Sequence, residues 1–117
     1  MAALKVAVLA TTGFSPFHFS VPCILFGSAL PQQDLFHVDI CALKPGPVIS
    51  EMGLSITVEQ GLDPLDQADI IIVPYWHNPA EKPAQALLDK LVAAWQRGAE
   101  IVGLCLGTYV LAYAGLL

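Results

Sequence analysis

One cysteine stands where a turn between a strand and a helix could make its thiol reactive. The segment "VGLCLGTYVL", residues 102–111, places Cys105 between Gly103 and Gly107, after an apolar run and before a helix-like stretch. Two flanking glycines allow a tight turn, as in the nucleophile elbow G-x-S-x-G, here with cysteine at its centre. The N–H groups at a helix start favour a thiolate and can hold an oxyanion. The alternative is a small buried hydrophobe beside two glycines, and the spacing leaves both open.

Other residues could complete a site around this cysteine. His18, in "SPFHFS", could form a Cys–His dyad with Cys105, or it could cap a helix start or lie on the surface. Tyr75 and Trp76 follow an apolar strand, where aromatic rings can wall a pocket or plug the end of a sheet. Trp76 is the better candidate for ligand contact, and we expect the neighbouring His77 to be solvated.

The remaining reactive residue types predict no metal or cofactor site. Cys23 and Cys41 are interpreted as inert core thiols, and the odd number of cysteines without metal-like spacing indicates reduced thiols. The aspartates at 63, 66 and 69 are expected to be loop charges or caps, because no further ligand joins them.

Composition narrows the class of protein. The chain has 117 residues, is 56% hydrophobic and 13% charged, and carries a formal net charge of −5. Its five basic residues are scattered, so no nucleic-acid footprint is present. No apolar run is long enough to span a bilayer, and we expect a cytoplasmic protein. So little surface charge suggests that apolar surface meets a partner, for which a homodimer is our expectation.

The elements that must position these residues alternate between strands and helices. Continuous apolar runs predict strands near 5–10, 69–73 and 100–104, and an alternating one predicts a strand near 36–42. Helices are expected over 21–30, with Pro22 in its first turn, over 79–98, with Trp95 in the core, and after Cys105. Short strands are expected on either side of Met52-Gly53. This order predicts a flavodoxin-like three-layer α/β fold with a mostly parallel sheet.

Four separated segments carry a family resemblance. They are "VAVLATTGFSPFHFSVPCILFG", "GPVISEMGLSITVEQGLDPL", "ADIIIVP" and "GAEIVGLCLGTYVLAYAGLL". In this order they resemble the ThiJ/PfpI family of the class I glutamine amidotransferase-like superfamily. They are most similar to the N-terminal sensor domain of AraC-family transcriptional regulators of the GlxA and FtrA type.

The resemblance assigns roles and exposes departures from the family pattern. It places the nucleophile on Cys105, the acidic residue of the first loop on His18, and the oxyanion-side glycine on Tyr75. In family proteases a histidine follows the cysteine, whereas this chain has Leu106. The hydrolytic apparatus therefore looks incomplete, and we interpret Tyr75, Trp76, Leu106 and Gly107 as ligand-binding residues.

The resemblance implies a regulatory function. Residues 1–117 would form a single, incomplete sensor domain that binds a small-molecule effector near Cys105, and DNA would contact only an absent C-terminal helix-turn-helix region. A truncated domain should expose side chains such as Val110, Leu111 and Leu116. The alternatives are a cysteine-dependent amidase, peptidase or glyoxalase-like enzyme, and a redox-responsive protein.

Overall fold

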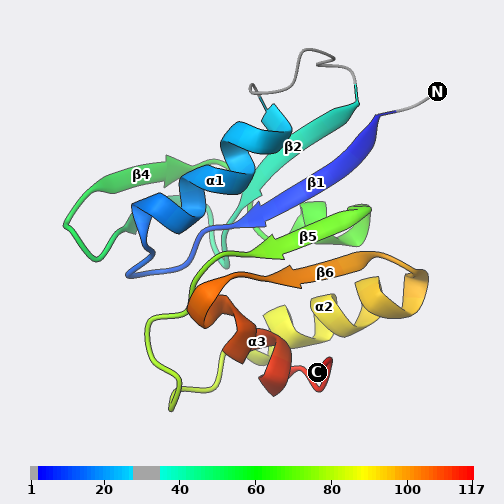
Figure 1. The fold of residues 1–117 in the computed structure, drawn as a ribbon. Helices are drawn as coiled ribbons and strands as arrows, with labels where there is room; N and C mark the ends of the chain where they lie inside the picture. Colours follow the sequence, from blue (N-terminus) through cyan, green and yellow to red (C-terminus); the bar gives the residue numbers. More distant parts are fainter. Residues whose placement is uncertain (1–2, 28–34) are drawn as a thin grey trace.

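A parallel sheet organises the chain. The computed structural model describes residues 3–27 and 35–117, and Figure 1 shows a four-stranded sheet in the order β2-β1-β5-β6. All neighbouring strands are parallel. The strands are β1 (Leu4–Leu9), β2 (Phe36–Cys41), β5 (Ile70–Val73) and β6 (Glu100–Gly103). The predicted three-layer α/β class with a mostly parallel sheet is confirmed.

The two central strands are buried on both faces, as their uninterrupted apolar runs predict. Side chains alternate between faces, so Val6, Val8 and Ile72 point into one core cluster. Their neighbours Ala7, Leu9, Ile71 and Val73 point into the cluster on the other side. Each face therefore needs its own cover of helices or strands.

The first face is covered by α1 (Pro16–Gly27) and a hairpin of β3 (Gly46–Ile49) and β4 (Ser55–Val58). The predicted helix start at residue 21 is wrong, because the helix begins five residues earlier and encloses Pro22. Pro16 opens the helix, since its fixed φ and missing N–H suit a first position. Residues 28–30 of the predicted helix lie outside the described residues.

The second face is covered by α2 (Gln85–Arg97) and α3 (Thr108–Tyr113), with the short helix η1 (Asp63–Asp66) beside α2. The helix expected over 79–98 begins only at Gln85, but it stops at Gly98 as predicted, where a left-handed φ of 103° caps it. Trp95 was expected in the core, but it is 58% exposed because α2 turns it away from the sheet.

The expected exposure of the last helix is wrong for two of its three side chains. Val110 and Leu111 are buried against α2 and the sheet, and Leu116 is half-buried. Other apolar side chains of this last segment are exposed, namely Tyr109, Tyr113 and Leu117. Val102 is exposed as well, on the face of the edge strand β6 that α1 does not reach.

Two general features bear on function. No helix among the described residues is long and apolar enough to cross a membrane. Within residues 3–27 and 35–117, no three histidine, cysteine or acidic side chains are grouped so that they could hold a metal ion.

Candidate functional site

Cys105 lies in a turn between β6 and α3. Leu104 is still extended, Cys105 begins the short helix η2 (Cys105–Gly107), and α3 follows directly at Thr108. The φ of Cys105 is +51°, and among the described residues Cys105 is the only one other than glycine with a positive φ. Such a φ costs on the order of 1–3 kcal/mol and persists only where the surroundings impose it. The thiol is exposed. The predicted strand–turn–helix geometry around Cys105 is therefore present, and we call residues 103–108 the Cys105 turn.

The two glycines of the turn are required by close packing. A Cβ on Gly107 would lie 1.9 Å from the carbonyl oxygen of Val73, at the end of β5. A Cβ on Gly103 would lie 2.9 Å from the Cα of Thr108. Both distances are far below van der Waals contact, so the turn sits directly on the carboxyl end of the neighbouring strand.

The expected catalytic partners do not surround the thiol. His18 Nδ1 is 2.8 Å from Ser15 Oγ, and no hydrogen bond joins His18 to Cys105 in the described part of the chain. The N–H of Gly107 donates to the carbonyl oxygen of Leu104 at 2.8 Å, so it is not free to hold an oxyanion. Leu106, at the position of the family histidine, is half-buried.

Tyr75 has different neighbours. Partial burial raises the pKa of its phenol, and the nearby charges of Glu51 and Cys105 raise that pKa further. Glu51 comes from the tip of the β3–β4 hairpin, whose backbone is fastened near α1 by the Glu51 N–H bond to the Phe14 carbonyl at 3.0 Å. A carboxylate from the hairpin therefore acts on Tyr75, whereas the family pattern takes its acidic residue from the first loop. Nothing in the sequence signalled this approach, because residues 51 and 75 are distant along the chain.

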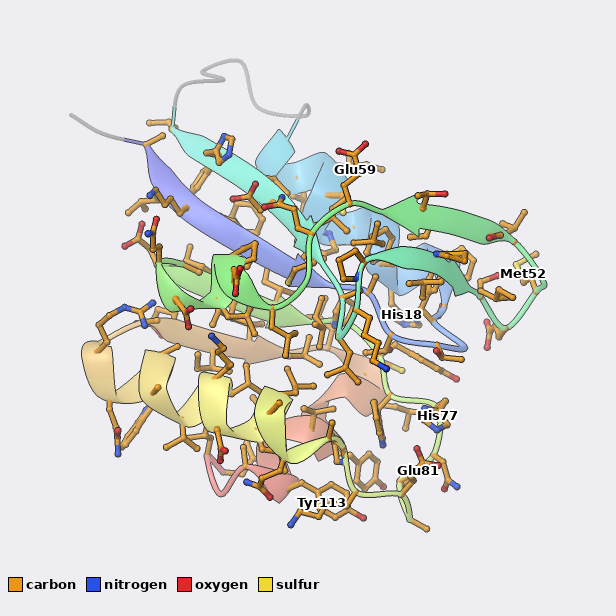
Figure 2. All side chains as sticks on the ribbon, turned by 180° about the vertical axis from the view of Figure 1, so that it is seen from behind. His18, Met52, Glu59, His77, Glu81 and Tyr113 are labelled. Atoms are coloured by element: carbon orange, nitrogen blue, oxygen red, sulfur yellow. The ribbon has the colours of Figure 1, made fainter. Side chains whose placement is uncertain are left out.

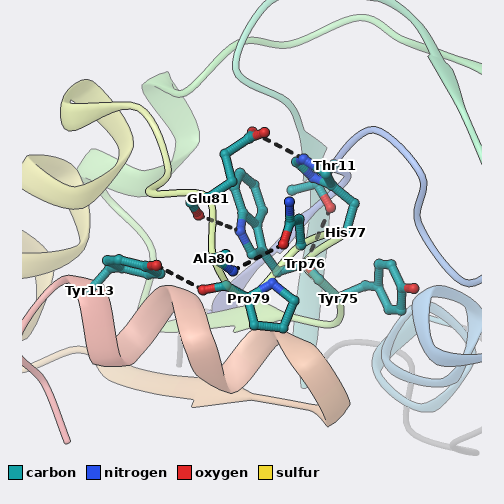
Figure 3. A network of polar contacts seen from close by, with 9 residues as sticks. Thr11, Tyr75, Trp76, His77, Pro79, Ala80, Glu81 and Tyr113 are labelled. Carbon is teal, nitrogen blue, oxygen red and sulfur yellow. Dashed lines mark hydrogen bonds and ion pairs between the residues drawn. The ribbon is translucent and has the colours of Figure 1, made fainter.

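The loop after β5 is fixed by a network of polar contacts (Figure 3). Thr11 Oγ1 donates to the Tyr75 carbonyl at 3.2 Å, and Trp76 Nε1 donates to the Glu81 carbonyl at 2.9 Å. His77 Nε2 lies 3.0 Å from Glu81 Oε2. From α3, the Tyr113 hydroxyl donates to the Pro79 carbonyl at 2.7 Å. His77, expected to be solvated, is exposed but paired with this carboxylate.

A cavity opens at the same carboxyl edge of the sheet, but Cys105 does not line it. It has a volume of about 470 Å³ and opens at the carboxyl ends of β1 and β2. Its walls come from segments far apart in the chain: residues 9–12, 42–44, 47–48, 76–77, 81–82, 84 and 87. Of the predicted ligand-binding residues, Trp76 lines it and is 8% exposed, whereas Tyr75, Leu106 and Gly107 do not line it.

The other two thiols have apolar surroundings. Burial raises the pKa of Cys41 to about 12, with a contribution from the charge of Asp39. Burial also raises the pKa of Cys23. Both thiols therefore stay protonated at neutral pH, which suits the interpretation of core cysteines.

Sequence reasoning missed the polar residues of the cavity. Thr11 and Thr12 directly follow β1, and ligands in open parallel sheets bind at the carboxyl ends of the strands. That position was the signal that could have revealed them. Lys44 and Lys82 were counted only among the scattered basic residues.

The fold and the cysteine turn together define a class. No family model matches the chain. A solved ThiJ/PfpI family protein from Pseudomonas syringae superposes over 100% of this chain with a TM-score of 0.84, although only 23% of the residues are identical. The chain covers 48% of that protein. This is the fold of ThiJ/PfpI proteins.

More specific relatives are transcriptional regulators. An AraC family transcriptional regulator from Pseudomonas putida is 25% identical, with a TM-score of 0.80 over 97% of this chain. The HTH-type transcriptional regulator CdhR of Pseudomonas aeruginosa is 31% identical over 86 residues, or 74% of this chain. The chain spans 62% of the length of the Pseudomonas putida regulator structure and 26% of the length of CdhR. The resemblance to ThiJ/PfpI proteins and AraC-family regulators is confirmed.

Proposed function

We propose that this chain is the ligand-sensing regulatory domain of an AraC-family transcriptional regulator. The observation that carries the proposal is the match over 97% of the chain to a solved AraC family regulator, at a TM-score of 0.80. The similarity to CdhR supports the same function from sequence. A small-molecule effector shifts the equilibrium between two arrangements of domains or subunits, and that shift is the signal.

The surroundings of Cys105 support binding better than catalysis. An exposed thiol in a turn at the carboxyl edge of the sheet can contact a ligand. Acyl transfer needs an oriented base, yet His18 is bonded to Ser15 and Leu106 cannot accept a proton. In this proposal the effector binds near Cys105, at this edge of the sheet, and contacts Trp76 in the wall of the cavity.

DNA contact belongs to another region of the regulator. This chain carries a net charge of −5 and five basic residues. Arg97 donates to the carbonyls of Leu65 and Ala68, and Lys90 pairs with Asp66. A domain with so few free cations would not neutralise several phosphates, which DNA binding requires.

A homodimer is supported by apolar residues exposed on α1 and the hairpin. Phe17, Ile24 and Leu25 share one face of α1 at helical spacing, and each is at least half exposed. Met52 and Leu54 are also exposed, at the hairpin tip, where Figure 2 shows Met52 projecting. Sedimentation of the wild type and Ile24→Glu at matched concentrations tests the dimer, which the variant should dissociate. A monomeric wild type would remove this part of the proposal.

The second candidate is a cysteine enzyme of the ThiJ/PfpI type. It is favoured by the positive φ of Cys105, because strained backbone at a reactive residue occurs at many active sites. Such an enzyme would use Cys105 as its nucleophile on an amide or glyoxal substrate. The catalytic base of such an enzyme would have to come from residues outside the Cys105 turn.

Transcript profiling separates the two candidates. A strain that lacks the encoding gene should show altered expression of a limited set of genes, which the full-length protein restores. The purified full-length protein should show no turnover of amide, peptide or glyoxal substrates above a Cys105→Ala control. Robust turnover that disappears in Cys105→Ala, with an unchanged transcript profile, would establish the enzyme and overturn the sensor.

A further inference from the structure

The 470 Å³ cavity collects unpaired positive charge. Of the five basic side chains, Lys5, Lys90 and Arg97 each bond to a side chain or carbonyl of η1 or the segment just after it. Within the described residues, Lys44 and Lys82 have no hydrogen-bond or ion-pair partner, and both line this cavity. In a chain of net charge −5, the two uncommitted lysines, both exposed, therefore line the same cavity.

The one carboxylate in the cavity wall offsets only one of these two positive charges. Glu81 also lines the cavity, but its Oε2 is engaged with His77 Nε2 at 3.0 Å, and its carbonyl accepts from Trp76. Two ammonium groups against one carboxylate leave the cavity wall with a net positive charge. Lysines hold carboxylate and phosphate groups as point charges.

The rest of the wall is mostly apolar and suits the body of an organic ligand. Leu9, Val48, Trp76 and Leu87 contribute aliphatic and aromatic surface. The hydroxyl-bearing residues Thr11 and Thr12 come from the loop after β1. Small-molecule sites typically have volumes of about 300–1,000 Å³ and combine apolar walls with a few polar groups.

We infer that this cavity is a binding site for a small organic anion, whose carboxylate or phosphate lies between Lys44 and Lys82 and whose apolar body packs on Trp76. The site does not include Cys105. The claim that this cavity binds the regulator's effector rests on the proposed function. The claim that it binds an organic anion rests on the cavity alone.

Binding of matched probes tests the inference without reference to transcription. Benzoate and phenyl phosphate carry the anionic head on a ring, whereas benzamide has nearly the shape of benzoate without its charge. Titration calorimetry on the protein, or tryptophan fluorescence, gives a dissociation constant for each probe. We expect benzoate or phenyl phosphate to bind at least tenfold more tightly than benzamide in low salt, and 0.5 M NaCl to reduce that preference.

Charge-neutralising variants locate the site. The double variant Lys44→Gln/Lys82→Gln should lose at least tenfold in affinity for the anionic probes and keep its affinity for benzamide. The matched control Lys5→Gln/Lys90→Gln removes the same charge away from the cavity and should change both by less than twofold. Equal binding of benzoate and benzamide, no binding of any probe, or equal losses in the two double variants would each overturn the inference. The transcript experiment tests the regulatory function separately, so either proposal can fail while the other stands.

Discussion

The Cys105 turn and the lysine-lined cavity lie at the same edge of the sheet but are built differently. The turn comes from one continuous segment, and its shape follows from two glycines, Gly107 packed on the end of β5 and Gly103 packed on Thr108. The cavity is assembled from the loops after β1, β2 and β5 together with the hairpin. A motif marks the first in the sequence, and no motif marks the second. A sequence motif for a reactive residue and a cavity that can hold a ligand therefore need not lie at the same place.

The two regions also differ in what holds them. Backbone packing around the turn leaves no room for a single methyl group. The loop after β5, which borders the cavity, is held by side-chain hydrogen bonds such as those of Tyr113 and Trp76. Each such bond contributes only modestly to the free energy of unfolding. We therefore expect substitutions in the turn to act on folding, and substitutions around the cavity to act on binding and local order.

Gly107→Ala should have the largest effect. The new Cβ would lie 1.9 Å from the Val73 carbonyl oxygen, so β5, the turn or both must move. We expect a loss of more than about 3 kcal/mol in the free energy of unfolding, measured by urea denaturation.

Gly61→Ala is the matched control near the cavity. Its Cβ would meet Pro45 at 3.6 Å, an ordinary contact, and its φ is not in the left-handed region. The free energy of unfolding should change by no more than about 0.5 kcal/mol. Similar losses in the two variants would contradict the contrast between the regions.

Thiol labelling compares the turn with the strand that leads to the cavity. Cys105 is exposed, whereas Cys41 is buried with its pKa raised to about 12, immediately before the cavity residue Ala42. The reactive species is the thiolate, and a thiol with a pKa near 12 has little thiolate at pH 8. We expect iodoacetamide at pH 8 to modify Cys105 at least about a hundredfold faster than Cys41, as followed by peptide mass spectrometry. Cys23, half-buried with a raised pKa, should react at an intermediate rate. Comparable rates for Cys105 and Cys41 would remove the evidence for an accessible turn.

Tyr113→Phe tests the bond that links the two regions. Its hydroxyl, on the helix after the turn, donates to the carbonyl of Pro79 in the loop that borders the cavity. Loss of this partly exposed bond should cost about 0.5–1 kcal/mol in thermal or urea denaturation. Amide exchange should quicken in the loop 77–82, while the labelling rate of Cys105 stays within twofold. A change confined to Cys105 would show that the hydroxyl serves the turn rather than the loop.

Glu51→Gln should have the smallest effect. Removal of the carboxylate charge should lower the raised pKa of Tyr75, because the phenolate would no longer face that charge. Ultraviolet titration of the phenol absorbance, against a Tyr75→Phe blank, measures the change. Glu81→Gln, on the cavity side, is the control and should leave this titration unchanged. An unaltered pKa in Glu51→Gln would show that the hairpin tip does not reach the turn in solution.

Local pattern predicted much of the fold. Runs of Val and Ile predicted β1 and β5, and Gly98 predicted the end of α2, because these features follow from short-range geometry. The start of α1 was misplaced because Pro16 and Pro22 both suit a first turn, and only packing of Phe19 on the sheet selects the earlier one.

The site was predictable only where it is local. The turn at Cys105 could be inferred from its glycines. The approach of Glu51 to Tyr75 and the placement of Lys44 and Lys82 on one cavity depend on tertiary packing, which no spacing along the chain encodes. Trp95 was assigned to the core by helical periodicity, yet α2 buries its aliphatic side chains and leaves this ring in water.

The contrast between the two tryptophans gives the protein an internal optical reporter. Trp76, 8% exposed in the cavity wall, should emit at shorter wavelength and resist quenching by iodide. Trp95, 58% exposed on α2, should emit at longer wavelength and be quenched readily. In Trp95→Phe the remaining emission would come from the cavity alone, so ligand entry could be followed in real time without a label.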